Sequence, residues 1–364
     1  MRKFIRFLLL RPVLWAAAKF SSRPNRERIF KALDQLYELI KKQPCKRGPL
    51  LSFELPTGKF IIFSDQHKGA RNGADDFMLS EINYLAALEY YAAKDFCFIN
   101  LGDSEELWEN SLGRVKKCNG KTFDAERKFL QKNKFVKLFG NHDLYWDNDP
   151  FASFQLKEIY QQKLKIHEGV VLETRINNKP LHIFCTHGHQ GDAQSDGNWF
   201  SKFFVAKIWA PLQAYLRINP NTPAYDGTTK TLHNTIMYEW SSQQKDLLLI
   251  TGHTHQPVFG SLTHLERLYK QYQFAKQKNN ADELESLQDE IRKREKEFTA
   301  VSLDYMTMRP TYFNSGCCCF VDGDITGIEI DEGCMRLIKW KLKDESPERE
   351  ILEEIKLTEL VALI

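Results

Sequence analysis

The sequence predicts an α/β protein on two observations. Short apolar runs rich in aromatic and β-branched residues, which are typical of buried strands, recur at 59–63, 96–101 and 135–139. Between these runs lie segments such as 77–94, whose apolar residues return with helical spacing. Strands that alternate with helices in this way are typical of an α/β core.

The composition is that of an ordinary globular protein of 364 residues, with 42% hydrophobic and 27% charged residues. The net charge of +3 is too small to indicate a nucleic-acid partner, and we expect none. Eight cysteines are present, three of them consecutive at 317–319, and no CxxC pair occurs. We therefore expect reduced cysteines packed in the core, no zinc ribbon and a cytoplasmic location.

We divide the chain into an N-terminal basic amphipathic helical segment (1–48), a catalytic domain (49–345) and a C-terminal tail (346–364). Residues 1–20 are apolar and aromatic, but Arg6, Arg11 and Pro12 interrupt any signal-peptide or membrane-spanning core. This segment is either an amphipathic helix docked on the protein or an interfacial helix. The second interpretation predicts peripheral contact of residues 1–20 with the inner face of a membrane.

The remaining elements follow the same two patterns. A helix is expected at 27–42, where Ile29, Leu33 and Ile40 recur at helical spacing, and another at 124–134. Further strands are expected at the apolar runs 181–185, 247–250, 312–319, 325–330 and 334–342.

Two stretches interrupt the alternation within the catalytic domain. The first, at about 192–240, is crowded with large aromatic and aliphatic residues. It is either a helical subdomain that buries its own core or an aromatic helical cap over the site, with room for an acyl chain. The second, at about 262–300, is predicted to be a helical hairpin with charged outer faces, broken near 278–282. This hairpin either packs on the domain or mediates a homodimer.

Five polar segments indicate the chemistry, and each follows a strand-like run. They are Asp65-Gln66-His67, Gly102-Asp103, Gly140-Asn141-His142-Asp143, His187-Gly188-His189 and Gly252-His253-Thr254-His255. Strand ends that meet at one sheet edge are where α/β proteins place their sites. Oxygen and nitrogen ligands without cysteine suit Mn²⁺, Fe or Zn²⁺. A pair of such ions needs several ligands. The candidates are Asp65, His67, Asp103, Asn141, His187, His253 and His255.

These segments make the chain similar to the calcineurin-like metallophosphoesterases, whose pattern is D-x-H, G-D, G-N-H-D/E, H-G and G-H-x-H. The resemblance runs from about residue 60 to residue 340 and includes Asn314-Ser315-Gly316, which is similar to the family's Asn-Thr-Gly strand. It implies the family's fold, a four-layer β-sandwich of two sheets flanked by helices, here with helical insertions. It also implies hydrolysis of phosphate esters with two divalent metal ions.

The resemblance also assigns metal ligands by matching position, with Asp103 bridging the two ions. A hydroxide held between the ions is the implied nucleophile, which attacks phosphorus. The two ligand sets are Asp65, His67 and His255 for one ion, and Asn141, His187 and His253 for the other.

Two further residues have catalytic roles in this resemblance. His142 assists the leaving-group oxygen as a general acid, and Asp143 orients His142. His189 is a candidate substrate or supporting contact. The histidines that belong to no motif are expected to be structural, and these are His167, His182, His233 and His264.

The substrate class comes from a closer resemblance. Residues 65–71, 102–108 and 252–257 look like those of the branch that cleaves UDP-diacylglucosamine beneath a helical cap at the membrane surface. This implies a lipid-linked or nucleotide pyrophosphate or phosphodiester, with Lys68 and Arg71 as candidate contacts for a second phosphate. Two alternatives stay open. One is a protein or small-nucleotide phosphatase with the same site, and the other is a catalytically silent scaffold of this fold.

Overall fold

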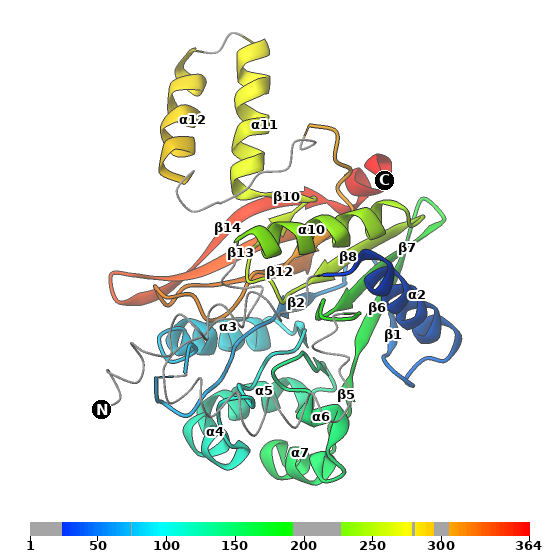
Figure 1. Cartoon of the computed structure of the whole chain (residues 1–364), viewed down its shortest axis with the longest axis vertical. Helices are drawn as coiled ribbons and strands as arrows, with labels where there is room; N and C mark the ends of the chain where they lie inside the picture. The colour runs from blue at the N-terminus through cyan, green and yellow to red at the C-terminus, as the bar shows by residue number, and fades with distance from the viewer. Residues whose placement is uncertain (1–23, 74, 192–226, 279–280, 295–305) are drawn as a thin grey trace.

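The computed structural model describes residues 24–73, 75–191, 227–278, 281–294 and 306–364 (Figure 1). The amphipathic helix expected at 1–20, either docked on the protein or interfacial, lies outside these residues. So does most of the aromatic insertion expected at 192–240, except for α10 (Gly227–Ser242) at its end. Among the described helices, none combines the length and the hydropathy needed to cross a membrane.

Within the described residues, two seven-stranded mixed sheets form the centre of the protein. Sheet A has the order β1 (Leu50–Ser52), β6 (Gly169–Ile176), β7 (Lys179–Thr186), β8 (Leu247–Thr251), β11 (Tyr312–Asn314), β9 (Val258–Phe259), β10 (Leu262–Thr263). Sheet B has the order β14 (Ser346–Lys356), β13 (Cys334–Lys343), β12 (Ile325–Asp331), β2 (Phe60–Phe63), β3 (Cys97–Asn100), β4 (Phe135–Leu138), β5 (Ile166–His167).

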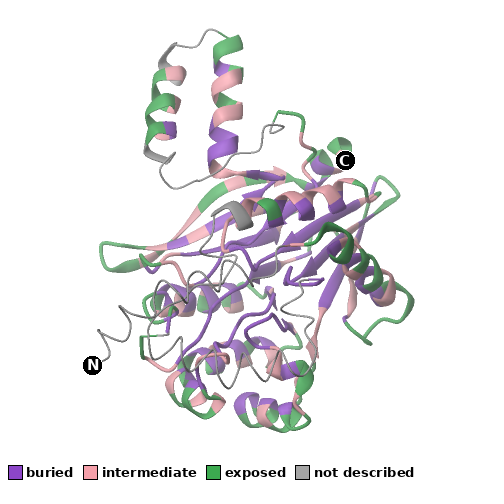
Figure 2. Cartoon of the chain, viewed as in Figure 1, coloured by how far each residue is buried: buried purple, intermediate pink, exposed green. Residues whose placement is uncertain are grey.

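Alternating side chains on the central strands separate two buried layers. In β2, Phe60 and Ile62 pack between the sheets against residues of sheet A such as Ile183. Ile61 and Phe63 point the other way, into the core beneath the helices of sheet B. Figure 2 shows these strands buried through most of their length. Strands buried on both faces read as continuous apolar runs, which explains why the sequence reveals them.

Helices cover the outer face of each sheet. On sheet B, buried residues come from all five described helices of that side, which are α3 (Glu81–Ala93), α4 (Leu112–Cys118), α5 (Gly120–Gln131), α6 (Tyr145–Asn148) and α7 (Ala152–Tyr160) (Figure 1). On sheet A, α10 and α2 (Arg26–Lys42) do the same. The predicted four-layer sandwich flanked by helices is therefore confirmed. One detail differs from expectation. The polar segments lie on loops of both sheets, and not at the edge of a single sheet.

Helix α2, which lies before the domain boundary predicted at residue 48, packs on sheet A of the sandwich. Asn25 caps the helix by accepting a hydrogen bond from the backbone N–H of Arg28 at 3.0 Å. Ile29, Leu33 and other apolar residues of α2 are buried against Phe184 and its neighbours on sheet A. The amphipathic pattern of 27–42 thus reflects packing on the sheet. The next element along the chain, β1, is the edge strand of the same sheet.

The last residues, which the sequence analysis separates as a C-terminal tail at 346–364, form secondary structure as well. Strand β14 pairs antiparallel with β13 along its whole length. Helix α13 (Leu357–Leu363) then buries Leu357 and Leu360 in the core between the sheets. Strand β14 escapes prediction because it lies at the edge of the sheet, where charged side chains are favoured and apolar alternation is weak.

The second insertion forms α11 (His264–Gln277) and α12 (Ala281–Arg294), which project from the body (Figure 1). A capping box of Thr263 and Glu266 begins α11. The pair has a small core of its own, built from Leu265, Leu268 and Ile291. Arg267 donates a hydrogen bond to Glu353 of β14 at 2.7 Å. The hairpin is thus attached at its base, and its role in dimer formation stays a prediction.

Replacing Leu33 by Ala should destabilise the whole sandwich by about 2–5 kcal/mol, because the side chain is fully buried between α2 and sheet A. Urea unfolding of the full chain would measure the change. Lys31→Ala, on the exposed face of the same helix, is the matched control and should stay within about 0.5 kcal/mol of the parent. A separate early transition that leaves the main unfolding step unaltered would show that α2 is an independent unit.

Candidate metal centre

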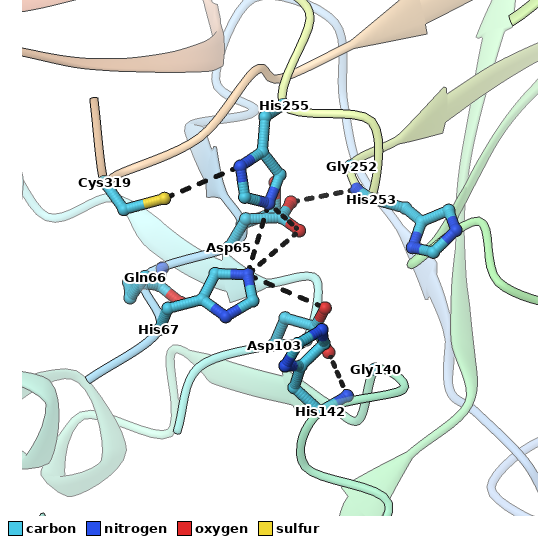
Figure 3. A network of polar contacts seen from close by, with 12 residues as sticks. Asp65, Gln66, His67, Asp103, Gly140, His142, Gly252, His253, His255 and Cys319 are labelled. Atoms are coloured by element: carbon cyan, nitrogen blue, oxygen red, sulfur yellow. Dashed lines mark hydrogen bonds and ion pairs between the residues drawn. The ribbon is translucent and has the colours of Figure 1, made fainter. Parts of the chain in front are cut away.

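The loops that follow β2, β3, β4, β7 and β8 bring the five polar segments together. Figure 3 shows residues from the segments after β2, β3, β4 and β8. Many of their residues have a left-handed backbone, which costs non-glycine residues of the order of 1–3 kcal/mol each. The φ angles are 53° for Asp65, 50° for His67, 48° for Asp103, 69° for His253 and 55° for His255. Such strain is held in place only where the surrounding structure requires it, as at a functional site.

Backbone amides fix one oxygen of each central carboxylate. Asp65 Oδ2 accepts a hydrogen bond from the N–H of His253 at 2.9 Å, and Asp103 Oδ1 accepts one from the N–H of His142 at 2.7 Å. Glycines make this approach possible, because a Cβ on Gly252 would lie 2.4 Å from Asp65 Oδ2, and one on Gly140 would lie 2.2 Å from Asp103 Oδ1. The second oxygen of each carboxylate is left to face the histidines.

The first group of ligand atoms comes from Asp65, His67 and His255, which lie within 4.8 Å of one another. The Nε2 atoms of the two histidines are 3.2 Å apart, and His255 Nε2 is 3.2 Å from Asp65 Oδ1. This is the set that the resemblance assigns to one metal ion.

The second group comes from Asp103, His187 and His253, which also lie within 4.8 Å of one another. His187 Nε2 is 3.2 Å from both Asp103 Oδ2 and the side-chain oxygen of Asn141. The opposite ring nitrogen, Nδ1, faces the backbone oxygen of Leu101 at 3.1 Å, which orients the ring.

Asp103 connects the two groups. Its Oδ2 lies 3.2 Å from His187 Nε2 and 3.8 Å from His67 Nε2, so a single oxygen faces both clusters. Burial raises the pKa of Asp103, but the rings of His187, His142 and His67 outweigh burial and hold that pKa well below its usual range. The carboxylate is therefore ionised and available as a ligand.

Two buried ligand atoms in these clusters make no hydrogen bond with the described residues. One is His253 Nε2, and the other is Asp65 Oδ1, which is within ion-pair distance of the rings of His255 and His67 alone. An unsatisfied buried polar group costs about 1–3 kcal/mol. Burial and the neighbouring His233 and His187 lower the pKa of His253 well below its usual value, so its ring is neutral, as a metal ligand must be. The donor set and its unpaired atoms therefore fit a pair of divalent cations.

His142 lies at the edge of this arrangement, with its ring stacked on Trp108 at a centroid distance of 4.2 Å. The carboxylate that contacts it is Glu106, whose Oε2 is 2.7 Å from His142 Nδ1 and 2.9 Å from His67 Nδ1. Burial raises the pKa of Glu106, but the two rings lower it to about 2. Sequence reasoning missed Glu106, although it lies only three residues after Asp103 in an acidic segment.

Asp143 contacts backbone amides, whereas the sequence analysis expects it to orient His142. It accepts hydrogen bonds from the backbone N–H groups of Gly140 at 2.6 Å and Ser104 at 2.8 Å. Asp143 thus joins the loops that carry Asn141 and Asp103. Burial, with the nearby Glu105 and Asp103, raises its pKa to about 6.

Lys68 does not face the site, so it does not fit the contact with a second phosphate for which it was a candidate. It is fully buried, with Nζ 2.6 Å from Glu126 and 3.1 Å from Glu105. Lys137 contacts the same Glu105 oxygen at 3.0 Å. These four charges form a buried network beneath the metal centre. Arg71 is partly exposed and pairs with Glu81 of α3 at 2.5 Å.

Other candidate residues lie beside the clusters. The ring of His189 is 5.2 Å from that of His187, and the ring of His233, on α10, is 5.1 Å from that of His253. The sequence offered no motif for His233. His182 contacts Glu173 away from the site, as expected for a structural residue. Cys319 was not expected near the ligands, yet its sulfur lies 3.7 Å from His255 Nδ1.

Comparison with known proteins adds a family match. A family model described as calcineurin-like phosphoesterase matches residues 58–257, which include all five polar segments. No curated protein matches the chain. Among solved structures, Vacuolar Protein Sorting 29 from Cryptosporidium parvum is 12% identical, covering 82% of this chain and 98% of that chain with a TM-score of 0.32. A single mutant of Vps29 from Entamoeba histolytica is 14% identical, covering 81% and 98%, with a TM-score of 0.31.

Acid should destabilise the metal-free protein through Glu105. Burial raises the pKa of Glu105, but Lys137 and Lys68 outweigh burial and lower it to about 2, against 4.5 for an ordinary glutamate. Because the folded-state pKa is the lower one, the stabilisation is present above about pH 4.5 and is lost as the pH falls toward 2. The full loss amounts to roughly 3 kcal/mol.

Urea unfolding at a series of pH values measures this loss. Glu105→Gln should be less stable than the parent at about pH 7 and should lose less stability on acidification. Glu359→Gln, which changes an exposed carboxylate on α13, should follow the parent. Parallel pH curves for the parent and Glu105→Gln would show that other groups carry the acid response.

Proposed function

Because this chain belongs to the calcineurin-like phosphoesterases, we propose that it hydrolyses phosphate esters with the help of two divalent metal ions. Members of that family are generally metal-dependent phosphoesterases. The observation that carries the proposal is the position of Asp103, whose Oδ2 faces His67 of one cluster and His187 of the other. Two ions that share a carboxylate can act together on one phosphorus centre.

The candidate ligands form the two groups that the distances between their atoms define. Asp65, His67 and His255 would hold one ion, and His187 and the rest of the second group would hold the other. Nitrogen and oxygen ligands favour Mn²⁺, Fe or Zn²⁺. When bound, the two ions supply Lewis-acid charge to the phosphoryl oxygens and make a water more acidic. The second group is completed by Asn141 and His253, with Asp103 shared.

His142 is the candidate general acid. Its Nδ1 is engaged by Glu106 at 2.7 Å, which leaves Nε2 as the nitrogen able to give a proton to a leaving oxygen. Trp108 stacks against the ring and fixes its plane. Glu106 also contacts His67, so one carboxylate positions both the proton donor and a metal ligand. We assign to Glu106 the orienting role that the sequence suggested for Asp143.

Exposed apolar residues support a substrate with an apolar group. Met78, Leu79 and Ile82 are exposed near the start of α3, and Val321, on the adjoining loop, is 94% exposed. The two segments touch, because Asn83 donates a hydrogen bond to the backbone oxygen of Gly323 at 2.8 Å. Val321 is only two residues beyond Cys319, which contacts His255. We therefore favour a lipid-linked or nucleotide pyrophosphate or phosphodiester over a protein phosphate.

The decisive assay is manganese-dependent hydrolysis of p-nitrophenyl phosphate and bis-p-nitrophenyl phosphate by the full chain. The ratio of the two rates separates monoesterase from diesterase activity. A nucleotide-linked lipid pyrophosphate and a phosphopeptide, tested in parallel, separate the favoured substrate from the phosphatase alternative. Absence of turnover on every substrate, with two ions bound, would instead support a catalytically silent scaffold.

Replacing His142 by Ala should leave both ions bound and lower kcat by about 100- to 10,000-fold on an ester with a poor leaving group. The loss should be smaller for p-nitrophenyl phosphate than for phenyl phosphate, because p-nitrophenolate leaves without a proton. His167→Ala, on β5 outside the site, is the control. Equal losses on both esters, or loss of metal along with turnover, would argue against a general acid.

Asp103→Asn should weaken both ions together, by roughly tenfold or more in affinity, because one oxygen faces both clusters. Metal analysis after dialysis against graded chelator would count the ions that remain. Asp65→Asn is the matched comparison, since it should weaken chiefly the ion held with His67 and His255. Loss of a single ion from the Asp103 variant would rule out a bridging carboxylate.

A further inference from the structure

Two thiols and an imidazole lie together beside the proposed catalytic centre. The sulfur atoms of Cys317 and Cys319 and a ring nitrogen of His255 are within 4.8 Å of one another. Cys319 Sγ lies 3.7 Å from His255 Nδ1, while Nε2 of the same ring lies 3.2 Å from Asp65 (Figure 3). The ring of His255 thus stands between a cluster rich in oxygen and nitrogen and a pair of sulfur atoms.

The loop that carries the thiols is held firmly in place. The N–H of Cys318 donates a hydrogen bond to the backbone oxygen of Asp65 at 3.1 Å, and the N–H of Thr326 donates one to that of Cys317 at 3.0 Å. The hydroxyl of Ser64 donates to the backbone oxygen of Gly316 at 3.1 Å. Ligands fixed by such supporting bonds need little reorganisation when an ion binds.

The consecutive cysteines divide between two environments. Cys318 is fully buried in the core beneath the helices of sheet B, on the opposite side from its neighbours. Cys317 is buried beside His255, and Cys319 is partly exposed, which opens a route from solvent. All eight cysteines of the chain are free thiols, so none of the three is tied up in a disulfide.

We propose that Cys317, Cys319 and His255 bind one thiophilic divalent cation of the Zn²⁺ or Cd²⁺ class, separate from the two phosphoesterase ions. Thiolate pairs select soft cations, whereas the carboxylate-rich clusters suit harder ones. Two sulfur ligands and one imidazole leave a fourth, tetrahedral position for water. On binding, each thiol and the Nδ1 position give up their protons to solvent, and no electron is transferred.

The shared ring gives this site a consequence for activity, and this step rests on the proposed function. A cation on the thiol side would bind the same imidazole that holds a catalytic ion through Nε2. It would draw electron density from that nitrogen or turn the ring. A thiophilic cation should therefore inhibit turnover without displacing the ions bound by hard ligands.

Titration of Cd²⁺ into the reduced, manganese-loaded full chain tests the site directly through the ultraviolet thiolate-to-metal absorption band. The parent should show a band that saturates at one Cd²⁺ per chain, and the double variant Cys317→Ser/Cys319→Ser should lose it. Cys318→Ala, whose thiol faces the core, is the matched control and should keep the band. Circular dichroism confirms folding of each variant. No band in the parent, or an equal band in the double variant, would overturn the proposal.

Turnover measured with and without Cd²⁺, each variant compared with its own rate, tests the coupling. The parent should be inhibited, and the double variant should be resistant. Inhibition that persists after the band is lost would refute the coupling and place the inhibitory Cd²⁺ in the catalytic clusters. If the absorption band depends on the cysteines but neither the parent nor any variant shows turnover, the proposed function is rejected and the cation site is upheld. His255→Ala should then still weaken the band, and an unchanged band would exclude the imidazole.

Discussion

The structure depends on the burial of two carboxylates, Asp65 and Asp103, side by side in the protein interior. Buried charge is costly unless it is paired and hydrogen-bonded. One oxygen of each carboxylate accepts a hydrogen bond from a backbone amide. The loops that carry these amides can pass close to the carboxylates only because Gly252 and Gly140 lack side chains. The remaining oxygen of each carboxylate faces histidine rings, and this is where a divalent cation would bind.

Beneath the carboxylates, a second set of charges is satisfied internally. Lys68 and Lys137 meet Glu105 and Glu126 in a fully buried network, and Tyr84 and Tyr160 donate hydrogen bonds to Glu126. Positive and negative groups are equal in number here, and each carboxylate of the network is paired with a lysine. It joins the loops after β2 and β3 to α5 and forms a rigid base. A structural network of this kind has its charges balanced within the chain, and this distinguishes it from the candidate ligand site above it.

The sequence predicted the two-sheet fold because strands buried on both faces read as apolar runs, and the polar segments follow those runs directly. It also picked out seven residues that the structure brings together, although their roles as ligands stay predictions. Side-chain partners that depend on tertiary contacts could not be predicted from the sequence. Glu106 rather than Asp143 reaches His142, and Lys68 turns inward instead of toward a substrate. Strand β14 was missed because an edge strand need not alternate.

In the left-handed loops, the residues that suit the backbone best are not the residues that supply metal ligands. Aspartate and histidine accept this conformation less readily than asparagine or glycine do. Gly at a position such as His253 would therefore suit the left-handed backbone better than the present residue does, while removing a ligand. The loop would keep its shape while the centre lost a metal ligand, so the fold alone does not preserve the chemistry.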